Sequence, residues 1–269
     1  MITIQDVAAF LEDFAPSSLA AEWDNVGLLV GDKTQSIERV MTCLTVTPAV
    51  AEEAVRERVG LIVTHHPLPF QPLQRLTTDQ PAGRLLLQLI RAGIAIYSPH
   101  TRFDSASEGI NQQLATGLGL LEIKPLVPRQ LSGDATTAEA KLGDGRYGRF
   151  TAPTKLADVA SRLKQFLKIS GLHMVGNDQR PIERAAVACG SAGEFLTAAL
   201  EKGCQLLVTG ETRLHTCYEA EAQGIALLLA GHYASERFGI ENLAAVLQAK
   251  FPAAKIWASR DERDPLSWR

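Results

Sequence analysis

The sequence predicts an α/β protein with two similar domains from an internal duplication, each with a mainly parallel sheet flanked by helices. Three observations predict this class. Short apolar runs alternate with segments of helical periodicity along the chain, as in parallel sheets with helical connections. The second half repeats the element order of the first. The composition, 46% hydrophobic and 21% charged residues, is that of a globular protein.

The first half follows this pattern in order. Thr3 and Asp6 form an N-cap signal for a helix whose apolar residues continue at helical spacing to Phe14 and which Pro16 ends. The turn residues 23–25, Trp-Asp-Asn, precede a strand and have two interpretations: a structural turn with the tryptophan packed on the core, or a lining of a cleft. The other elements expected are strands at 28–30, 39–46, 60–64 and 93–97 and helices at 48–58, 84–91 and 111–120.

The second half opens with an irregular segment. Residues 125–155 are rich in Pro, Gly, Thr and charge and predict a linker, an edge hairpin or both. Their GDGRYG (143–148) has the form GxGxxG, but no buried strand precedes it and Pro153 follows, so we expect no phosphate site there. The remaining elements expected are helices at 154–167, 193–202, 214–223 and 237–250 and strands at 184–189, 206–209, 225–230 and 255–258.

The two halves align with each other over their central elements. LIVT at 61–64 then matches LLVT at 206–209, and GIAIYSPH at 93–100 matches GIALLLAGH at 224–232. The alignment predicts a first domain of residues 1–126, completed by the C-terminal segment 237–269, and a second domain of residues 127–236.

The charge and hydropathy patterns exclude several classes. A net charge of -3 without a Lys/Arg tract argues against a nucleic-acid partner. No apolar run has the length of a membrane span, and the first residues do not form a signal peptide, so we expect a cytoplasmic protein. The four cysteines form no CxxC pair, which favours inert buried thiols.

Five residues suited to metal binding follow the predicted strands. His65 and His66 come directly after a buried strand, Asp104 follows the next strand, and His232 and Glu236 are four residues apart. Imidazole and carboxylate ligands at strand ends suit two divalent ions of the Zn, Fe or Mn class, with water in the open positions. The alternatives are half-buried histidines bonded to the backbone and an i,i+4 surface pair.

Five motifs resemble those of the Ngg-one-interacting-factor-like proteins, which include the YbgI-like dinuclear metal-centre proteins and the GTP cyclohydrolase I type 2 homologues. The motifs, in this order, are WDNVGLLVG, LIVTHHP, SPHTRFD, VTGETRLH and AGHYASE. The resemblance implies two α/β domains, a dinuclear centre and a homohexamer built as a trimer of dimers. The lack of a long apolar run adds the expectation of no membrane partner. It assigns the metal ligands to His65, His66, Asp104, His232 and Glu236.

The sequence departs from the family pattern at two positions. Thr45 stands where the family often has Asp, and Gly210-Glu211 stands where it usually has Gly-Asp. Neither position is a ligand in the resemblance. The departures bear on the hydrogen bonds that support the ligands.

Two functions fit these residues. The first is a metal-dependent hydrolase of a small molecule, a nucleotide in a GTP cyclohydrolase-like reaction or a phosphoester or amide, with His215, His100 or Glu211 as proton shuttle. The second is a non-catalytic protein for metal storage, delivery or metal-dependent regulation. The same five ligands serve both, and an inert scaffold is the third alternative.

Overall fold

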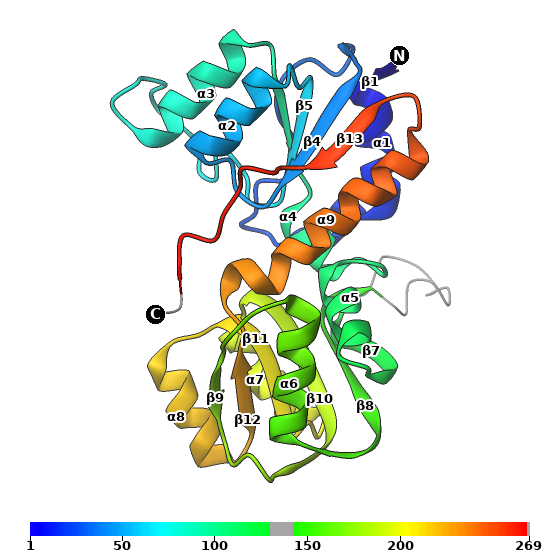
Figure 1. The fold of residues 1–269 in the computed structure, drawn as a ribbon, viewed down its shortest axis with the longest axis vertical. Coiled ribbons are helices and arrows are strands. Elements are labelled where there is room, and N and C mark those ends of the chain that lie inside the picture. Colours follow the sequence, from blue (N-terminus) through cyan, green and yellow to red (C-terminus); the bar gives the residue numbers. More distant parts are fainter. Residues whose placement is uncertain (130–141, 268–269) are drawn as a thin grey trace. The chain divides into compact units, whose positions relative to one another are not determined.

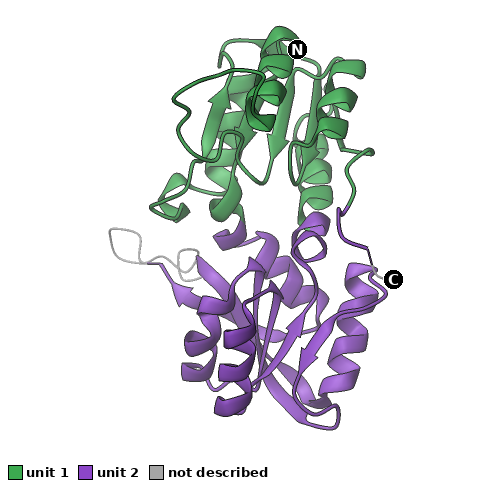
Figure 2. Ribbon diagram, turned by 90° about the vertical axis from the view of Figure 1, so that its left-hand side faces the viewer, with its two compact units in different colours: residues 1–103, 239–263 green, residues 104–238, 264–269 purple. Residues whose placement is uncertain are grey.

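The computed structural model describes residues 1–129 and 142–267 and contains two compact units (Figure 2). Unit 1 comprises residues 1–103 and 239–263, and unit 2 comprises residues 104–238 and 264–269. The chain passes between them within α4 (His100–Ser105), within α9 (His232–Lys250) and after residue 263. None of the helices in the described ranges has the length and hydropathy needed to cross a membrane.

Unit 1 is built on a five-stranded sheet that is parallel except at one edge. Its central strand, β5, is buried at all four positions, as the apolar run predicts. Only the edge strand β2 pairs antiparallel, with β6. The strand order is β13 (Lys255–Ala258), β4 (Arg39–Cys43), β5 (Leu61–Thr64), β6 (Ala95–Ser98) and β2 (Gly27–Val30). Two short strands, β1 (Ile2–Thr3) and β3 (Ser36–Ile37), pair separately.

Helices cover both faces of this sheet (Figure 1). On one face, α2 (Pro48–Arg56) and α3 (Pro81–Arg91) bury their apolar stripes against β4, β5 and β6. On the other face lie α1 (Ile4–Phe14) and the C-terminal part of α9, and the ring of Phe10 meets edge-on that of Phe251, the residue that follows α9. The predicted cap of α1 is confirmed, since Thr3 Oγ1 accepts from Asp6 N at 3.2 Å and the Asp6 carboxylate accepts from Thr3 N at 2.7 Å. A 3-10 turn, η1 (Ser17–Leu19), follows α1.

Unit 2 contains a mixed six-stranded sheet. Its order is β7 (Leu121–Pro128), β8 (Gly143–Lys155), β10 (Pro181–Ser191), β11 (Leu206–Glu211), β12 (Ala226–Leu229) and β9 (His173–Val175). The pairs β10–β11 and β11–β12 are parallel, and the other three are antiparallel. The helices α5 (Ile110–Gly117) and α6 (Leu156–Leu167) pack on one face, and α7 (Leu196–Glu201) and α8 (Leu214–Gln223) on the other. A 3-10 turn, η3 (Gly193–Phe195), leads into α7.

The two units share the element order that the internal alignment predicts. In unit 1, β4, α2, β5, α3 and β6 follow one another with parallel pairing, and in unit 2 β10, α7, β11, α8 and β12 do the same. The α/β class is confirmed, but in unit 2 the parallel pairing is limited to these three strands. The antiparallel pairs of this sheet come from β7, β8 and β9.

The irregular segment 125–155 forms the edge hairpin of β7 and β8, and its residues 130–141 lie outside the described ranges. The GDGRYG motif lies at the start of β8, not in a strand-to-helix turn. Its arginine, Arg146, is fully buried and donates to the carbonyls of Gly143, Gly145, Ser105 and Ala106. Burial lowers the pKa of Arg146 to about 10. The motif is therefore a structural arginine site.

The compact units do not begin and end at the predicted domain boundaries, 126/127 and 236/237. Residues 104–126 group with unit 2 because α5 and β7 pack against β8 and β10. Residues 264–269 also group with unit 2. At the second boundary, the division at 238/239 lies two residues beyond the predicted one.

Candidate metal centre

The tandem histidines continue the backbone pairing of β5 beyond the end of the strand. His65 N donates to Cys43 O at 2.9 Å, and His66 N donates to Leu44 O at 2.8 Å. Ser98, at the end of β6, donates through Oγ to His65 O at 2.7 Å. The backbone of both histidines is thus fixed by the neighbouring strands, at the carboxyl edge where parallel sheets place ligand sites.

Three histidines of unit 1 form one cluster. The ring of His65 is fully buried, and its centroid lies 5.2 Å from that of His66 and 5.1 Å from that of His100. Each ring offers a nitrogen, and the three nitrogens lie within 4.8 Å of one another. Ligand nitrogens lie about 2 Å from a zinc ion, so small side-chain adjustments bring these atoms to one ion or a close pair.

Two of these rings are oriented by a hydrogen bond at Nδ1. The Thr45 hydroxyl lies 2.7 Å from His66 Nδ1, and Asp24 Oδ1 lies 2.7 Å from His100 Nδ1. Asp24 also accepts from Thr101, through N and Oγ1. Burial raises the pKa of Asp24, but the hydrogen bonds from His100 and Thr101 outweigh it and lower this pKa below its ordinary value.

The C-terminal segment of unit 1 supports the Thr45 turn. Glu262, which is 5% exposed, accepts from Leu44 N at 2.9 Å and from Thr45 N at 2.7 Å. Glu53 of α2 in turn accepts from Ser259 Oγ at 2.6 Å and from Trp257 Nε1 at 3.0 Å. Sequence reasoning missed Glu262, because a glutamate in a charged segment far along the chain gives no sign that it is buried.

In unit 2, His232 and Glu236 lie on one face of the first turn of α9, so the predicted helix begins at His232 instead of residue 237. His232 Nε2 is 3.2 Å from Glu236 Oε2. A Cβ at Gly190 would lie 2.4 Å from Glu236 Oε1, and glycine there leaves the space for this pair. Glu211 Oε1 is 2.9 Å from His232 Nδ1. The positions of both family departures, Thr45 and Glu211, therefore hydrogen-bond the Nδ1 of a predicted ligand histidine.

The charges around His232 favour its protonated form in the absence of a metal. The hydrogen bond to Glu236 is the largest cause; burial opposes it, and the charge of Glu236 and the contact with Glu211 add to it. Together they raise the pKa of His232 to about 9. A cation that replaces this proton would keep the same partners.

Asp104 is fixed by Cys189, near the end of β10, and by Asn111 of α5. Its Oδ1 lies 3.1 Å from Cys189 Sγ, and its carbonyl accepts from Asn111 Nδ2 at 3.1 Å. Burial, together with the carboxylates of Asp104 and Glu236, holds the pKa of Cys189 well above its usual value. Cys189 is therefore a neutral thiol that can donate to Asp104. The sequence predicted an inert buried thiol and missed this contact.

The structure thus brings the predicted residues together in two sets. Unit 1 holds His65 and His66 with His100. Unit 2 holds His232 and Glu236 beside Glu211, while Asp104 is linked to Glu236 through Cys189, since both carboxylates raise the pKa of that thiol. His215 is exposed in the first turn of α8 and belongs to neither set. The interpretation in which Trp23 packs on the core is wrong, because this side chain is 61% exposed.

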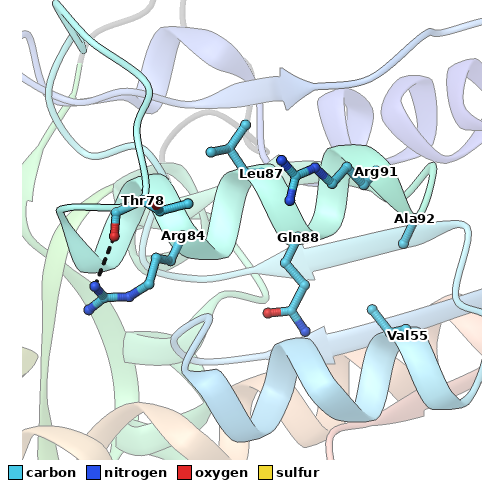
Figure 3. A pocket seen from close by; sticks show the side chains of 7 residues that line it. All are labelled: Val55, Thr78, Arg84, Leu87, Gln88, Arg91 and Ala92. Atoms are coloured by element: carbon cyan, nitrogen blue, oxygen red, sulfur yellow. Dashed lines mark hydrogen bonds between the residues drawn. The ribbon is translucent and has the colours of Figure 1, made fainter.

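Two hollows differ in their relation to these residues. A cavity of about 360 Å³ in unit 2 lies at the carboxyl ends of β11 and β12 and includes Glu211, with an apolar wall from Ile169, Leu229 and Leu266. A hollow of about 420 Å³ in unit 1 lies over α2 and α3, where Arg84 reaches to the carbonyl of Thr78 (Figure 3). Only the first contains a predicted site residue.

Comparison with known proteins identifies the family of the chain. The family model described as Duf34/NIF3 (NGG1p interacting factor 3) matches residues 2–265. The chain belongs to the Duf34/NIF3 family. Among curated relatives in this family, a "GTP cyclohydrolase 1 type 2 homolog" of Clostridium acetobutylicum is 32% identical, with 100% of this chain and 99% of the relative covered. The "NIF3-like protein 1" of Drosophila melanogaster is 31% identical over 95% of this chain and 86% of the relative.

Solved structures of similar proteins share the whole Duf34/NIF3 fold. Protein SA1388 of Staphylococcus aureus has a TM-score of 0.89 and 25% identity and covers 100% of this chain and 99% of its own. Reduced HcgD of Methanocaldococcus jannaschii has a TM-score of 0.80 and 26% identity, with 96% of this chain and 97% of its own covered. The expected family resemblance and the expected fold are both confirmed.

Proposed function

We propose that the protein binds two divalent metal ions of the Zn, Fe or Mn class and uses them to hydrolyse a small-molecule substrate. The five ligands in this proposal are His65 and His66 from unit 1 and Asp104, His232 and Glu236 from unit 2. The proposal requires both sets to coordinate the same pair of ions.

One observation carries the metal-binding part. His66, His100 and His232 each have a hydrogen-bond partner at Nδ1, namely Thr45, Asp24 and Glu211. A partner at one ring nitrogen fixes the ring and its tautomer, so that the other nitrogen can face an ion, which is the usual arrangement of metal-binding histidines. Single histidines are commonly hydrogen-bonded for structural reasons. The support here comes from three rings that share Nδ1 as the bonded atom and follow strand or helix ends.

The donor set fits the proposed ions. Imidazole and carboxylate groups bind first-row divalent ions, whereas a closed structural zinc site would use thiolates. The thiol of Cys189, kept neutral by its raised pKa, serves as a donor to Asp104 instead. When bound, the ions would supply Lewis acidity and an acidified water molecule.

The cavity in unit 2 favours hydrolysis over metal storage. A storage protein needs the ligands alone, but here a cavity of about 360 Å³ adjoins Glu211, which holds His232. This volume lies in the range of small-molecule sites. The side chain of Glu211 is 53% exposed, so it can accept a proton on the cavity side. Of the three candidate shuttles, Glu211 is the one that lines the cavity, whereas His100 belongs to the histidine cluster.

Assembly and location belong to the same proposal. The family resemblance supports a homohexamer built as a trimer of dimers, which native mass spectrometry would test. The four cysteines form no disulfide with one another, which supports a reducing compartment and hence the cytoplasm.

The test measures turnover and metal exchange on the same preparation. Zinc-, iron- and manganese-loaded protein is assayed on nucleotides, phosphoesters and peptides. We expect turnover of one substrate class, its loss in Glu236→Ala, and retention in Glu201→Ala, an exposed glutamate at the end of α7. Equal turnover in Glu236→Ala would reject the hydrolase. Absence of turnover together with rapid exchange of bound metal would support storage or delivery.

A further inference from the structure

Two exposed aromatic side chains border the histidine cluster of unit 1. Trp23 is 61% exposed and Phe70 is 45% exposed, and their ring centroids lie 6.0 Å apart at an angle of 46°. Each ring also meets His100, at 5.9 Å for Trp23 and 6.2 Å for Phe70. His100 in turn lies 5.1 Å from His65. The aromatic pair therefore lies at the edge of the cluster that we assign to metal binding.

Polar contacts hold this pair in place. Asn25 Nδ2 donates to Pro69 O at 2.8 Å, which joins the turn that carries Trp23 to the loop that carries Phe70. Asp24, beside Trp23, binds the ring of His100 and the backbone of Thr101. The Trp-Asp-Asn turn thus uses its two polar residues to fix the position of its exposed indole.

The exposure of these rings is unlike that of core aromatics. Neither ring belongs to the hydrophobic core of unit 1, as far as the described residues show, so core packing does not account for them. Exposed aromatic rings at a fixed position offer a flat apolar face, and nucleobases and similar rings stack on such faces for about 1–3 kcal/mol each. Their contact with His100 would bring a stacked ring next to the reactive centre.

We propose that Trp23 and Phe70 form a stacking site for a planar aromatic or heteroaromatic ring of the substrate. This inference deepens the proposed hydrolase function and rests on it for the role of the bound ring. Binding of the ring itself needs only residues of unit 1. The substrate class is therefore a ring compound such as a nucleotide, in preference to an aliphatic phosphoester or a peptide without aromatic side chains.

The experiment compares ligands that differ in the ring. The affinities of the full-length protein for guanosine monophosphate, cytidine monophosphate and ribose 5-phosphate are measured by calorimetry, with and without zinc. We expect at least one nucleotide to bind more tightly than ribose 5-phosphate. Trp23→Ala should weaken nucleotide binding roughly fivefold to 150-fold, the range that stacking implies. Trp23→Phe should restore most of it, and ribose 5-phosphate should bind all variants equally.

The outcomes separate this inference from the metal proposal. Equal nucleotide affinity in the wild type and Trp23→Ala, or no preference for either nucleotide over ribose 5-phosphate, would overturn the stacking site. A loss of self-association in Trp23→Ala without a change in nucleotide affinity would assign the patch to a second copy of the chain, and would also overturn it. Ring preference in a wild type that binds no metal would support the stacking site while rejecting the proposed metal centre.

Discussion

The hydrogen bond between His66 Nδ1 and the Thr45 hydroxyl gives the sharpest test of how the ligands are supported. Thr45→Val keeps the shape of the side chain and removes the hydroxyl that lies 2.7 Å from His66 Nδ1. Loss of such a partner typically weakens metal binding 10- to 100-fold. Because Thr45 is exposed, water can partly replace the hydroxyl, so we expect about a tenfold loss, the lower end of this range. Competition with a chromogenic zinc chelator at constant pH measures it.

Matched variants at the same position separate the loss of the hydrogen bond from changes in side-chain shape and in stability. Thr45→Ser keeps the hydroxyl and should bind zinc like the wild type. Thr45→Asp introduces the residue that the family often has, and its negative charge should strengthen binding by making His66 more basic. The free energy of unfolding of metal-free Thr45→Val should differ from that of the wild type by less than about 0.5 kcal/mol, as is usual for substitutions of exposed residues. Wild-type affinity in Thr45→Val, or equal losses in Thr45→Val and Thr45→Ser, would refute the reasoning.

Three further predictions test other contacts. Glu262→Gln turns an amide donor toward a backbone N–H, and it should lower the free energy of unfolding by about 1–3 kcal/mol in a denaturant titration. The control Asp261→Asn changes an exposed ion pair with Arg56 and should lower it by less than about 1 kcal/mol. The pKa of His232 is raised, so the protonated ring contributes to the stability of the metal-free protein. This contribution should be fully present below pH 6.5 and be lost as the pH rises through about 9. Zinc affinity should correspondingly rise about tenfold per pH unit over that interval, and a flat profile would contradict the assignment. Arg146→Met leaves buried carbonyls without their donor and should cost at least about 3 kcal/mol by thermal or denaturant unfolding; a cost below about 1 kcal/mol would contradict its structural role.

The sequence predicted the repeated core well because periodicity and caps are local signals. The run 61–64 became β5, and the signal at Thr3 and Asp6 became the capping box of α1. The hairpin of β7 and β8 was harder to predict, since Glu122 has positive φ and the β7–β8 register shifts between Leu121 and Lys124. Such irregular pairing depends on the partner strand and leaves no clear period in the sequence.

The ligand candidates could be predicted for the same local reason, but their supporting residues could not. His65, His66 and His232 follow recognisable strand ends. Glu262 acts on Thr45 from 217 residues along the chain, and Cys189 contacts Asp104 from 85 residues away. Contacts at such separations follow from the tertiary fold, so a single sequence gives no signal for them.

The stoichiometry of bound metal tests the central claim most directly. Protein loaded with zinc and then desalted is measured by inductively coupled plasma mass spectrometry, together with the double variants His65→Ala/His66→Ala and His232→Ala/Glu236→Ala and the control His215→Ala. We predict two zinc ions per chain in the wild type and in the control, and less than one in either double variant, because both sets share the pair of ions. One ion retained at full affinity in each double variant would show separate sites and contradict the account, as would a wild type that retains none.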